Sequence, residues 1–244
     1  MRGLFNLFGA AKLYFAGTTP AVPSADVASN FFFADYTAPE FSLPALTFNP
    51  LDTASAVTLS GSDLVATSVT TVANKVSRGT RYVINEARVI RFVCTTMATG
   101  SDMAVGFALK EQPLTARIWN NTTAISLEPS GDVSSNSVSL DTVSSYAQGD
   151  EIFWATKNGL SWIKVNSGDW NNDPAADPDA GTGGLSLPSY LLNQPLWPIV
   201  SLWNNDGAWT VDPDATGNGL TTFDTWGAIT PPVGGERFTA YMFW

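Results

Sequence analysis

Three copies of a Trp-Asn-Asn triplet are the residues of this sequence with the clearest capacity to bind a ligand. Indole rings can stack on the faces of sugars, while the neighbouring amides can hydrogen-bond hydroxyl groups. If the triplets met on one rim, they would form a saccharide- or protein-binding surface with tryptophan as its anchor. The alternative for each triplet is a core tryptophan followed by a turn. The candidate residues are Trp119, Asn120, Asn121, Trp170, Asn171, Asn172, Trp203, Asn204 and Asn205.

The loop around the second triplet is rich in oxygen atoms of the kind that bind calcium. Asp169, Asn171 and Asp173 are the candidate ligands. Their spacing departs from that of a helix-loop-helix calcium loop, because Pro174 stands at the glycine position and Ala180 at the position of the bidentate acid. Asp and Asn also dominate turns by bonding their own backbone. We therefore expect solvated turn acids here, and no bound metal.

The residues needed for common kinds of catalysis are missing. The sequence contains no His, which removes the usual general base near neutral pH and the commonest metal ligand. The single Cys94 lies in the apolar run VIRFVCTT and is expected to be a buried thiol. Asp150 and Glu151 are adjacent, so on a strand they would point to opposite faces and could not form a glycosidase pair. We expect no catalytic residue, no cofactor and a protein that is not an enzyme.

The charge balance of the 244 residues is acidic, with 12 Lys and Arg against 22 Asp and Glu. The resulting net charge of -10 argues against binding to a phosphate backbone. No stretch approaches the roughly 18 apolar residues of a membrane span, so we expect no membrane insertion. The segment ANKVSRGTRY concentrates Lys75, Arg78 and Arg81, and we expect these cations on a solvated edge or loop.

The composition changes near residue 46, and the chain is divided there. Residues 1–46 have spaced prolines and no sustained alternation, which predicts an arm that docks on a partner. A short apolar helix in this arm would either pack on its own domain or insert into the partner. Residues 213–244 form a C-terminal extension, expected to pack on the main domain rather than pair with a neighbouring subunit. The candidate docking residues are Leu4, Phe5, Phe8, Phe15, Phe31, Phe32 and Phe33.

Residues 47–212 consist of short runs rich in Val, Thr, Ile and aromatic residues, separated by Gly, Asn, Asp and Pro. Their close spacing predicts an all-β fold, an antiparallel two-sheet β-sandwich, rather than a parallel α/β sheet. The run AVTLSGSDLVATSV predicts two strands around an SGSD turn, and Asn158-Gly159 predicts a two-residue hairpin. Trp154, Trp162 and Trp197 lie inside apolar runs and are assigned to the core.

The order of these elements resembles a SPRY domain, a jelly-roll sandwich of concanavalin-like shape. The matching segments begin with FNPLDTASAVTLSGSDLVATSV, DMAVGFAL and GDEIFWATKNGLSWIKVNSGDWNNDPAADPDAGTGG, and end with PIVSLWNNDGAWTVD. In the third segment a strand leads through the Asn-Gly hairpin into a second strand and then into a loop rich in Gly and Asp. The amino-acid sequence of this loop is similar to that of SPRY-like modules in bacteriophage structural proteins. Residues 1–46 and the tail after Asp212 do not follow the family pattern.

The resemblance implies a non-enzymatic structural protein of a phage virion. Its arm would dock on capsid, tail or baseplate proteins, and its sandwich would bind a host-surface glycan or protein, or decorate the particle. Such a protein is expected to belong to a homo-oligomer or a larger assembly. The alternatives are a polysaccharide-degrading enzyme of concanavalin-like fold and a cellular SPRY module for protein interaction.

Overall fold

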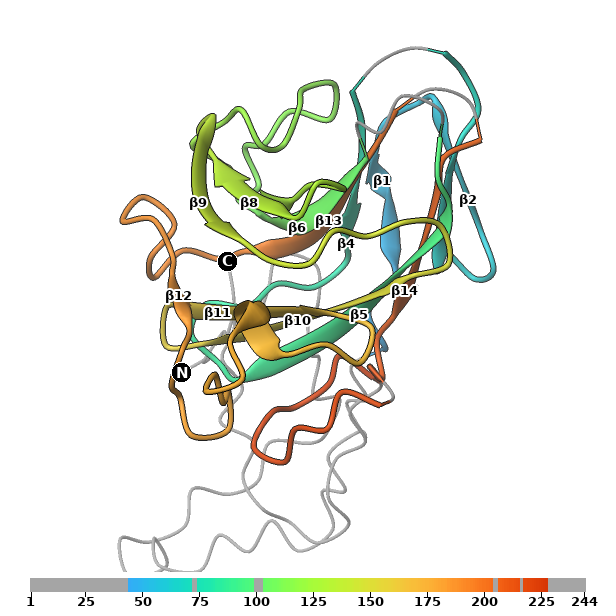
Figure 1. Cartoon of the computed structure of the whole chain (residues 1–244). Helices are drawn as coiled ribbons and strands as arrows, with labels where there is room; N and C mark the ends of the chain where they lie inside the picture. Colours follow the sequence, from blue (N-terminus) through green and yellow to red (C-terminus); the bar gives the residue numbers. More distant parts are fainter. Residues whose placement is uncertain (1–43, 72–73, 99–102, 204–205, 216, 228–244) are drawn as a thin grey trace, which may run out of the picture. The chain divides into compact units, whose positions relative to one another are not determined.

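The computed structural model describes residues 44–71, 74–98, 103–203, 206–215 and 217–227. These residues form a β-sandwich of two antiparallel sheets with seven strands each (Figure 1), which confirms the expected fold class. Within this part of the chain the one helical element is a 3-10 turn, η2 (Trp170–Asn172). No helix found there is long and apolar enough to cross a bilayer.

Each sheet combines a run of consecutive strands with strands that are distant in the sequence. The first sheet has the spatial order β1 (Phe48–Thr53), β4 (Lys75–Gly79), β13 (Trp197–Leu202), β6 (Ala104–Ala108), β7 (Ala124–Leu127), β8 (Asp132–Ser135) and β9 (Val138–Thr142). The second sheet has the order β12 (Leu185–Ser186), β11 (Leu160–Val165), β10 (Glu151–Lys157), β5 (Arg88–Thr96), β14 (Ala208–Asp212), β3 (Val65–Ser68) and β2 (Val57–Ser60).

Two turns that the sequence predicted connect strands as expected. Strands β2 and β3 pair from Ser60 and Val65 outward, around the SGSD turn. Strands β10 and β11 pair up to Lys157 and Leu160, around Asn158 and Gly159. Both hairpin residues have positive φ, 52° and 75°, which is the backbone twist that a two-residue hairpin requires.

Period-two alternation directs side chains into the space between the sheets. On β5, Ile90, Phe92 and Cys94 are fully buried in the central core, and Arg91 on the other face is partly exposed. Across this core the ring of Phe107 meets the ring of Trp154 edge to face, with centroids 5.7 Å apart. Cys94 is buried, as predicted, and burial raises its pKa to about 12, with a smaller contribution from the charge of Asp150.

The outer faces of both sheets are also partly covered, which gives two smaller cores. Ile118 and Trp119, in the loop between β6 and β7, pack on the outer face of the first sheet. Segment 213–227 packs on the second sheet, where Phe223 meets Trp162 edge to face at 6.2 Å. The core positions of Trp154 and Trp162 are confirmed, whereas Trp197 is only half-buried and its assignment to the core is wrong.

The predicted solvated position of Lys75 and Arg78 is wrong. Both lie on β4, between β1 and β13, and their exposed fractions are 2% and 1%. Arg78 is buried because Asp52 on β1 and the loop that carries Gln112 supply its polar partners, whereas the partners of Lys75 come from residues shortly before β4. Lys75 donates to the hydroxyl of Ser68 and the carbonyl of Thr70, both at 2.6 Å.

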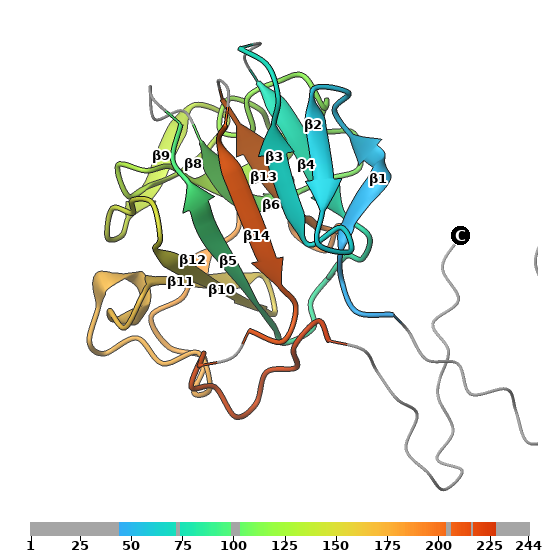
Figure 2. The same cartoon turned by 90° about the vertical axis from the view of Figure 1, so that its right-hand side faces the viewer.

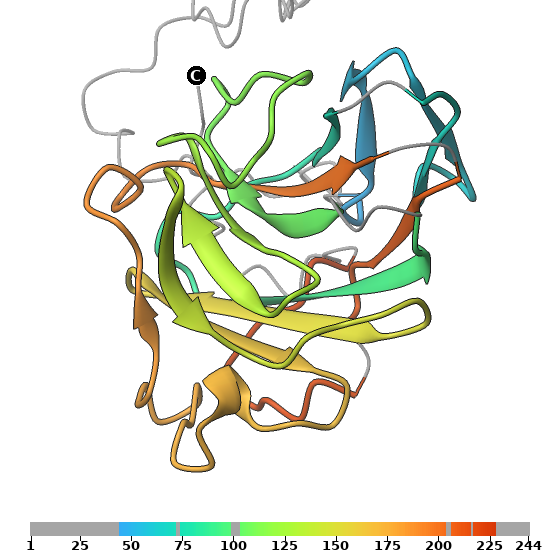
Figure 3. The ribbon, with the colours of Figure 1, turned by 45° about the horizontal axis from the view of Figure 1, so that its top comes forward.

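The edges of the two sheets differ in their surroundings. Figure 2 shows β1 and β2, the first strands of the two sheets, side by side at one edge of the sandwich. At the other edge, the yellow-green hairpin of β8 and β9 curves away from its sheet (Figure 3). There Ser144, just after β9, donates a hydrogen bond of 2.8 Å to Asn172. Side chains are exposed at both edges, among them Leu51 on β1 and Val138 on β9.

Candidate interaction surface

Strand β1 contains a large bulge that turns an apolar side chain outward. From Phe48 to Thr53 the strand advances five residues, while its partner β4 advances two, from Gly79 to Ser77. The extra residues loop out of the sheet. Leu51 lies in this bulge, and 95% of its surface is exposed. A leucine held in this way on an ordered strand is a candidate contact for another protein.

Short hydrogen bonds define the shape of the bulge. The side-chain oxygen of Asn49 accepts from the backbone N–H of Leu51 at 3.0 Å. The hydroxyl of Thr53 donates to the carbonyl of Asn49 at 2.8 Å and lies 2.8 Å from the hydroxyl of Ser77 on β4. The bulge is therefore tied to itself and to the neighbouring strand, so Leu51 is presented at little cost in side-chain and backbone entropy.

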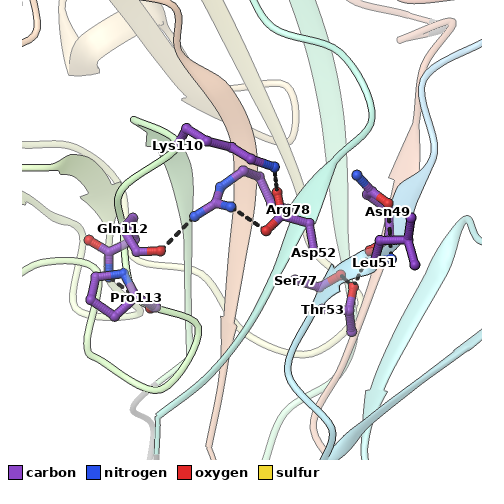
Figure 4. A network of polar contacts seen from close by, with 9 residues as sticks. All are labelled: Asn49, Leu51, Asp52, Thr53, Ser77, Arg78, Lys110, Gln112 and Pro113. Carbon is purple, nitrogen blue, oxygen red and sulfur yellow. Dashed lines mark hydrogen bonds and ion pairs between the residues drawn. The ribbon is translucent and has the colours of Figure 1, made fainter. Parts of the chain in front are cut away.

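A buried charge network lies behind the bulge (Figure 4). The guanidinium of Arg78 contacts one carboxylate oxygen of Asp52 at 2.5 Å and donates to the carbonyl of Gln112 at 2.6 Å. Lys110 binds the other carboxylate oxygen of Asp52. Burial alone would raise the pKa of Asp52, but the hydrogen bonds and charges of Lys110 and Arg78 outweigh burial and place this pKa below its usual value. Asp52 is therefore a charged anchor of the bulge.

The depressed pKa of Asp52 predicts a pH-dependent contribution to stability. Because the carboxylate has a lower pKa in the folded chain than in the unfolded chain, its contribution is complete above its ordinary pKa and is lost as the pH falls through the folded-state value. The difference in free energy of unfolding between the wild type and Asp52→Asn should therefore shrink between about pH 5 and pH 2. Urea titrations of both proteins across this range measure it. A difference that stays constant with pH would contradict the assignment.

Aromatic side chains lie beside this network. The ammonium of Lys110 is 5.9 Å from the ring centroid of Trp197, and the rings of Trp197 and Tyr82 are 4.8 Å apart. Both rings are half-buried. Tryptophan, tyrosine and a basic group that are partly exposed together have the composition of a protein-binding patch. We call Leu51, Tyr82, Lys110 and Trp197 the β1 surface.

The β1 surface was not found by sequence reasoning. Trp197 was assigned to the core because of the apolar run that contains it, and the segment with Arg78 was assigned to solvent. Leu51 and Lys110 carry no local signal, since their exposure depends on a bulge and on a carboxylate from another strand. The hint available in the sequence is Pro50, which lacks a backbone donor and is found on edge strands and at bulges.

Two of the three Trp-Asn-Asn triplets meet through an arginine. The guanidinium of Arg117 lies over the rings of Trp119 and Trp203, 5.3 Å and 4.9 Å from their centroids. Trp119 is 7% exposed, so it packs as a core residue, and Trp203 is half-buried. The amide of Asn121 donates to the carbonyl of Arg117, and Asn120 accepts from Ser137. Asn204 and Asn205 lie outside the described residues.

The remaining triplet lies on the outer face of the other sheet. The ring of Trp170 is 4.7 Å from the ammonium of Lys164. The side chain of Asn171 accepts from the N–H of Ile163 at 2.8 Å and donates to two backbone carbonyls, so it joins the loop to β11. Trp119 and Trp170 therefore pack on opposite outer faces of the sandwich, and a single rim with all three triplets does not form. Ligand binding by the separate triplets stays a prediction.

Two of the three candidate calcium ligands bind backbone groups through their side chains. Asn171 is engaged with β11, and Asp173 accepts from the N–H of Ala175 at 2.9 Å, as turn residues do. In the described parts of the chain, no three His, Cys, Asp or Glu residues gather in a way that could hold a metal ion. Burial raises the pKa of Asp179, but hydrogen bonds from four donor groups of Thr221 and Thr222 outweigh burial and lower this pKa to about 2. This aspartate ties the acidic loop to segment 213–227.

Two carboxylates approach each other on the outer face of the second sheet, at Arg91. One guanidinium nitrogen contacts Glu151 at 2.8 Å and another contacts Asp212 at 2.5 Å. The guanidinium thus lies where two glycosidase carboxylates would need a sugar. Asp150, which the sequence placed on the opposite side from Glu151, instead accepts from the N–H of Ala147 and the amide of Asn166.

The candidate docking residues of the arm cannot be placed on this surface. Leu4, Phe5, Phe8, Phe15, Phe31, Phe32 and Phe33 all lie outside the described residues.

Solved structures of SPRY domains are similar to this sandwich. The SPRY domain of human HERC1 matches with a TM-score of 0.54 and 14% identity, over 67% of this chain and 96% of that one. The PSpry domain of TRIM65 matches with a TM-score of 0.50 and 13% identity, over 69% and 89%. Stonustoxin matches with a TM-score of 0.50 and 13% identity, over 69% of this chain and 27% of that one. No family model and no curated protein matches the sequence. These likenesses confirm the SPRY-like fold.

Proposed function

We propose that this protein is a non-enzymatic structural component of a bacteriophage virion. In this proposal residues 1–46 dock on capsid, tail or baseplate proteins, and the SPRY-like sandwich is presented for binding to a host-surface protein or glycan, or as decoration. The resemblance of the Gly- and Asp-rich loop to loops of bacteriophage structural proteins supports the assignment to a phage. The observation that carries the proposal is that the first and the last described residues of the sandwich lie together.

The two ends are joined by contacts among Leu46, Arg81 and Trp226. The N–H of Leu46 donates to the carbonyl of Trp226 at 2.9 Å. Arg81 donates to the carbonyls of Trp226 and Gly227 at 3.1 Å and 3.2 Å, and to that of Pro44 at 3.5 Å. Its guanidinium also lies 5.7 Å from the ring centroid of Trp226. The two ends of the described sandwich are thereby held together, so both terminal segments are joined to it at the same place.

Deletion of residues 1–40 is expected to abolish incorporation into particles and to leave a folded sandwich. The arm would supply the docking contacts, whereas the contacts that join Pro44, Leu46 and Arg81 to Trp226 remain in the shortened chain. Particles produced with the full-length and shortened chains can be purified and compared by immunoblot, with thermal unfolding as a check of folding. Deletion of residues 228–244 is the matched control for loss of a terminal segment. Equal incorporation of the chain that lacks residues 1–40 would overturn the proposal.

A cellular SPRY module for protein interaction is the second candidate. The match to a human SPRY domain and the aromatic and basic composition of the β1 surface favour it. In this case the arm would pack on its own sandwich, and the protein would be a monomer. Deletion of residues 1–40 would then lower the free energy of unfolding measurably, which the virion proposal does not expect.

A polysaccharide-degrading enzyme is the third alternative, and the geometry of the second sheet gives it less support. The carboxylates of Glu151 and Asp212 share Arg91 as an ion-pair partner instead of facing an open groove at catalytic separation. We therefore retain the non-enzymatic assignment as part of the proposal.

A further inference from the structure

The sequence contains two Asn-Gly pairs, and the structure places them in different surroundings. Asn158 and Gly159 form the hairpin turn between β10 and β11. Asn218 and Gly219 lie in segment 213–227, outside any strand. In such a pair the backbone nitrogen of the glycine can attack the side-chain carbonyl carbon of the asparagine, because glycine has no Cβ to obstruct the approach. The two pairs can therefore be compared for one reaction, the loss of the side-chain amide.

The side chain of Asn218 is held against its own backbone. Its oxygen Oδ1 accepts from the N–H of Leu220 at 2.6 Å, and its amide donates to the carbonyl of Ala215 at 2.8 Å. The first bond closes an Asx turn, which folds the side-chain carbonyl back over the peptide bond that joins Asn218 to Gly219. The carbon that is attacked is thereby kept beside the nitrogen that attacks it, which raises the rate of an intramolecular reaction.

Two donors lie where negative charge develops in this reaction. The ammonium of Lys164 donates to the backbone carbonyl of Asn218 at 2.9 Å. That carbonyl belongs to the same amide as the nitrogen of Gly219, so the cation stabilises the negative charge that the amide acquires when this nitrogen loses its proton. The N–H of Leu220 donates to Oδ1, which becomes an oxyanion when the new bond forms. Both contacts lower the barrier to ring closure.

The backbone around Asn218 has room to rotate, as ring closure requires. The flanking residues Gly217 and Gly219 are exposed and have positive φ, 84° and 79°. A Cβ added to either glycine would meet no atom within 4 Å. The pair also lies outside both sheets, so a change in its dihedral angles breaks no hydrogen bond between strands.

The other Asn-Gly pair is fixed on both sides. Strands β10 and β11 pair up to Lys157 and Leu160, the residues next to the turn. The N–H of Asn158 donates to the carbonyl of Asn85 at 3.0 Å, and Gly159 is buried. Rotation of this peptide toward the side chain of Asn158 would disrupt the end of the hairpin, so the fold protects this pair.

We propose that Asn218 deamidates spontaneously in the folded protein, assisted by Lys164, and does so in preference to Asn158. The nitrogen of Gly219 gives its proton to a solvent base and bonds to Cγ of Asn218. The bond from Cγ to Nδ2 breaks, and the amide group leaves as ammonia after taking a proton from water. Water then opens the five-membered imide at either carbonyl, which gives aspartate or isoaspartate. The reaction adds one negative charge and is independent of the virion proposal.

Incubation of the purified full-length chain in mildly alkaline buffer tests the proposal. Peptide mass spectrometry measures deamidation at Asn218 and Asn158 in the same molecules, and isoaspartyl methyltransferase labels the isoaspartate product. We expect Asn218 to react at least about tenfold faster than Asn158 in the folded protein. In urea, where neither pair keeps its folded surroundings, the two rates should become similar. Equal rates in the folded protein, or a faster reaction at Asn158, would refute the proposal.

The variant Lys164→Met separates the effect of the cation from the effect of backbone freedom. It should slow the reaction of Asn218 about tenfold in the folded protein, because one charge-assisted hydrogen bond is lost, and leave the rate in urea unchanged. Lys164→Arg is the matched control, since it keeps a cation at this position and should react nearly as fast as the wild type.

The segment stays attached in both variants through Thr221, whose N–H and hydroxyl donate to Asp179. Tryptophan fluorescence checks that the fold is unchanged. A folded Lys164→Met protein that deamidates at the wild-type rate would show that the cation takes no part, and the assisted reaction would then be wrong.

Discussion

Replacing Arg78 with methionine is expected to lower the free energy of unfolding by about 3–5 kcal/mol, because the change removes one partner of a buried ion pair. Arg78 is 1% exposed, and its guanidinium contacts Asp52 at 2.5 Å and the carbonyl of Gln112 at 2.6 Å. Methionine fills much of the same space but leaves both oxygens without their buried donor. Urea-induced unfolding followed by tryptophan fluorescence measures the loss.

Lys110→Met is the matched control for this prediction. Lys110 binds the same carboxylate, but its side chain is 54% exposed, so water can take its place. We expect this variant to lose no more than about 1 kcal/mol. The double variant Asp52→Asn and Arg78→Met should be more stable than Arg78→Met alone, because it removes a carboxylate that has lost its buried partner and keeps only the half-exposed Lys110. Equal losses from Arg78→Met and Lys110→Met would show that burial does not govern the strength of this network.

Gly106→Ala is expected to destabilise the sandwich by at least about 3 kcal/mol, or to prevent its folding. Gly106 lies on β6, between β13 and β7, where it pairs with Ile199 and Ser126. A Cβ atom added to Gly106 would lie 2.0 Å from the carbonyl oxygen of Ile125 and 2.8 Å from the Cα of Ser126. Both are backbone atoms of β7, so no side chain can rotate away and the strand itself would have to move.

The control for this change is Gly181→Ala. Gly181 has a φ of +75°, and a Cβ added there would meet no atom within 4 Å. Its substitution should cost about 1–2 kcal/mol, from backbone strain alone. Denaturant midpoints of the two variants give the comparison. A Gly106→Ala protein as stable as Gly181→Ala would show that β6 and β7 can separate without loss, contrary to the packing observed.

Exposure of a side chain in this sandwich is decided by strand position rather than by polarity. Arg78 and Lys75 are buried on an interior strand, where β1 and β13 flank them, whereas Leu51 is exposed on the edge strand β1. The network of Asp52 connects these two departures, since it neutralises the buried arginine and fixes the bulge that presents the leucine. Stability and recognition at the β1 surface therefore depend on the same carboxylate.

The predicted binding residues illustrate a second limit of local patterns. Each Trp-Asn-Asn triplet has the same composition, but Trp119 packs on one sheet and Trp170 on the other. Identical residues do not specify which sheet a loop will cover, because the sheet that it covers depends on the order of the strands. For this reason the triplets could be recognised as candidates, but their separation could not be predicted.

The sequence by itself determined the all-β fold, the β2–β3 and β10–β11 hairpins and the core positions of Trp154 and Trp162. These features depend on period-two alternation and on the dihedral preferences of Asn158 and Gly159, which are local properties of the chain. Only the tertiary structure decided that Arg78 is buried and that Leu51 is exposed. Those outcomes depend on Asp52 and on the loop between β6 and β7, which are distant in sequence and meet β4 only when the sheets have assembled.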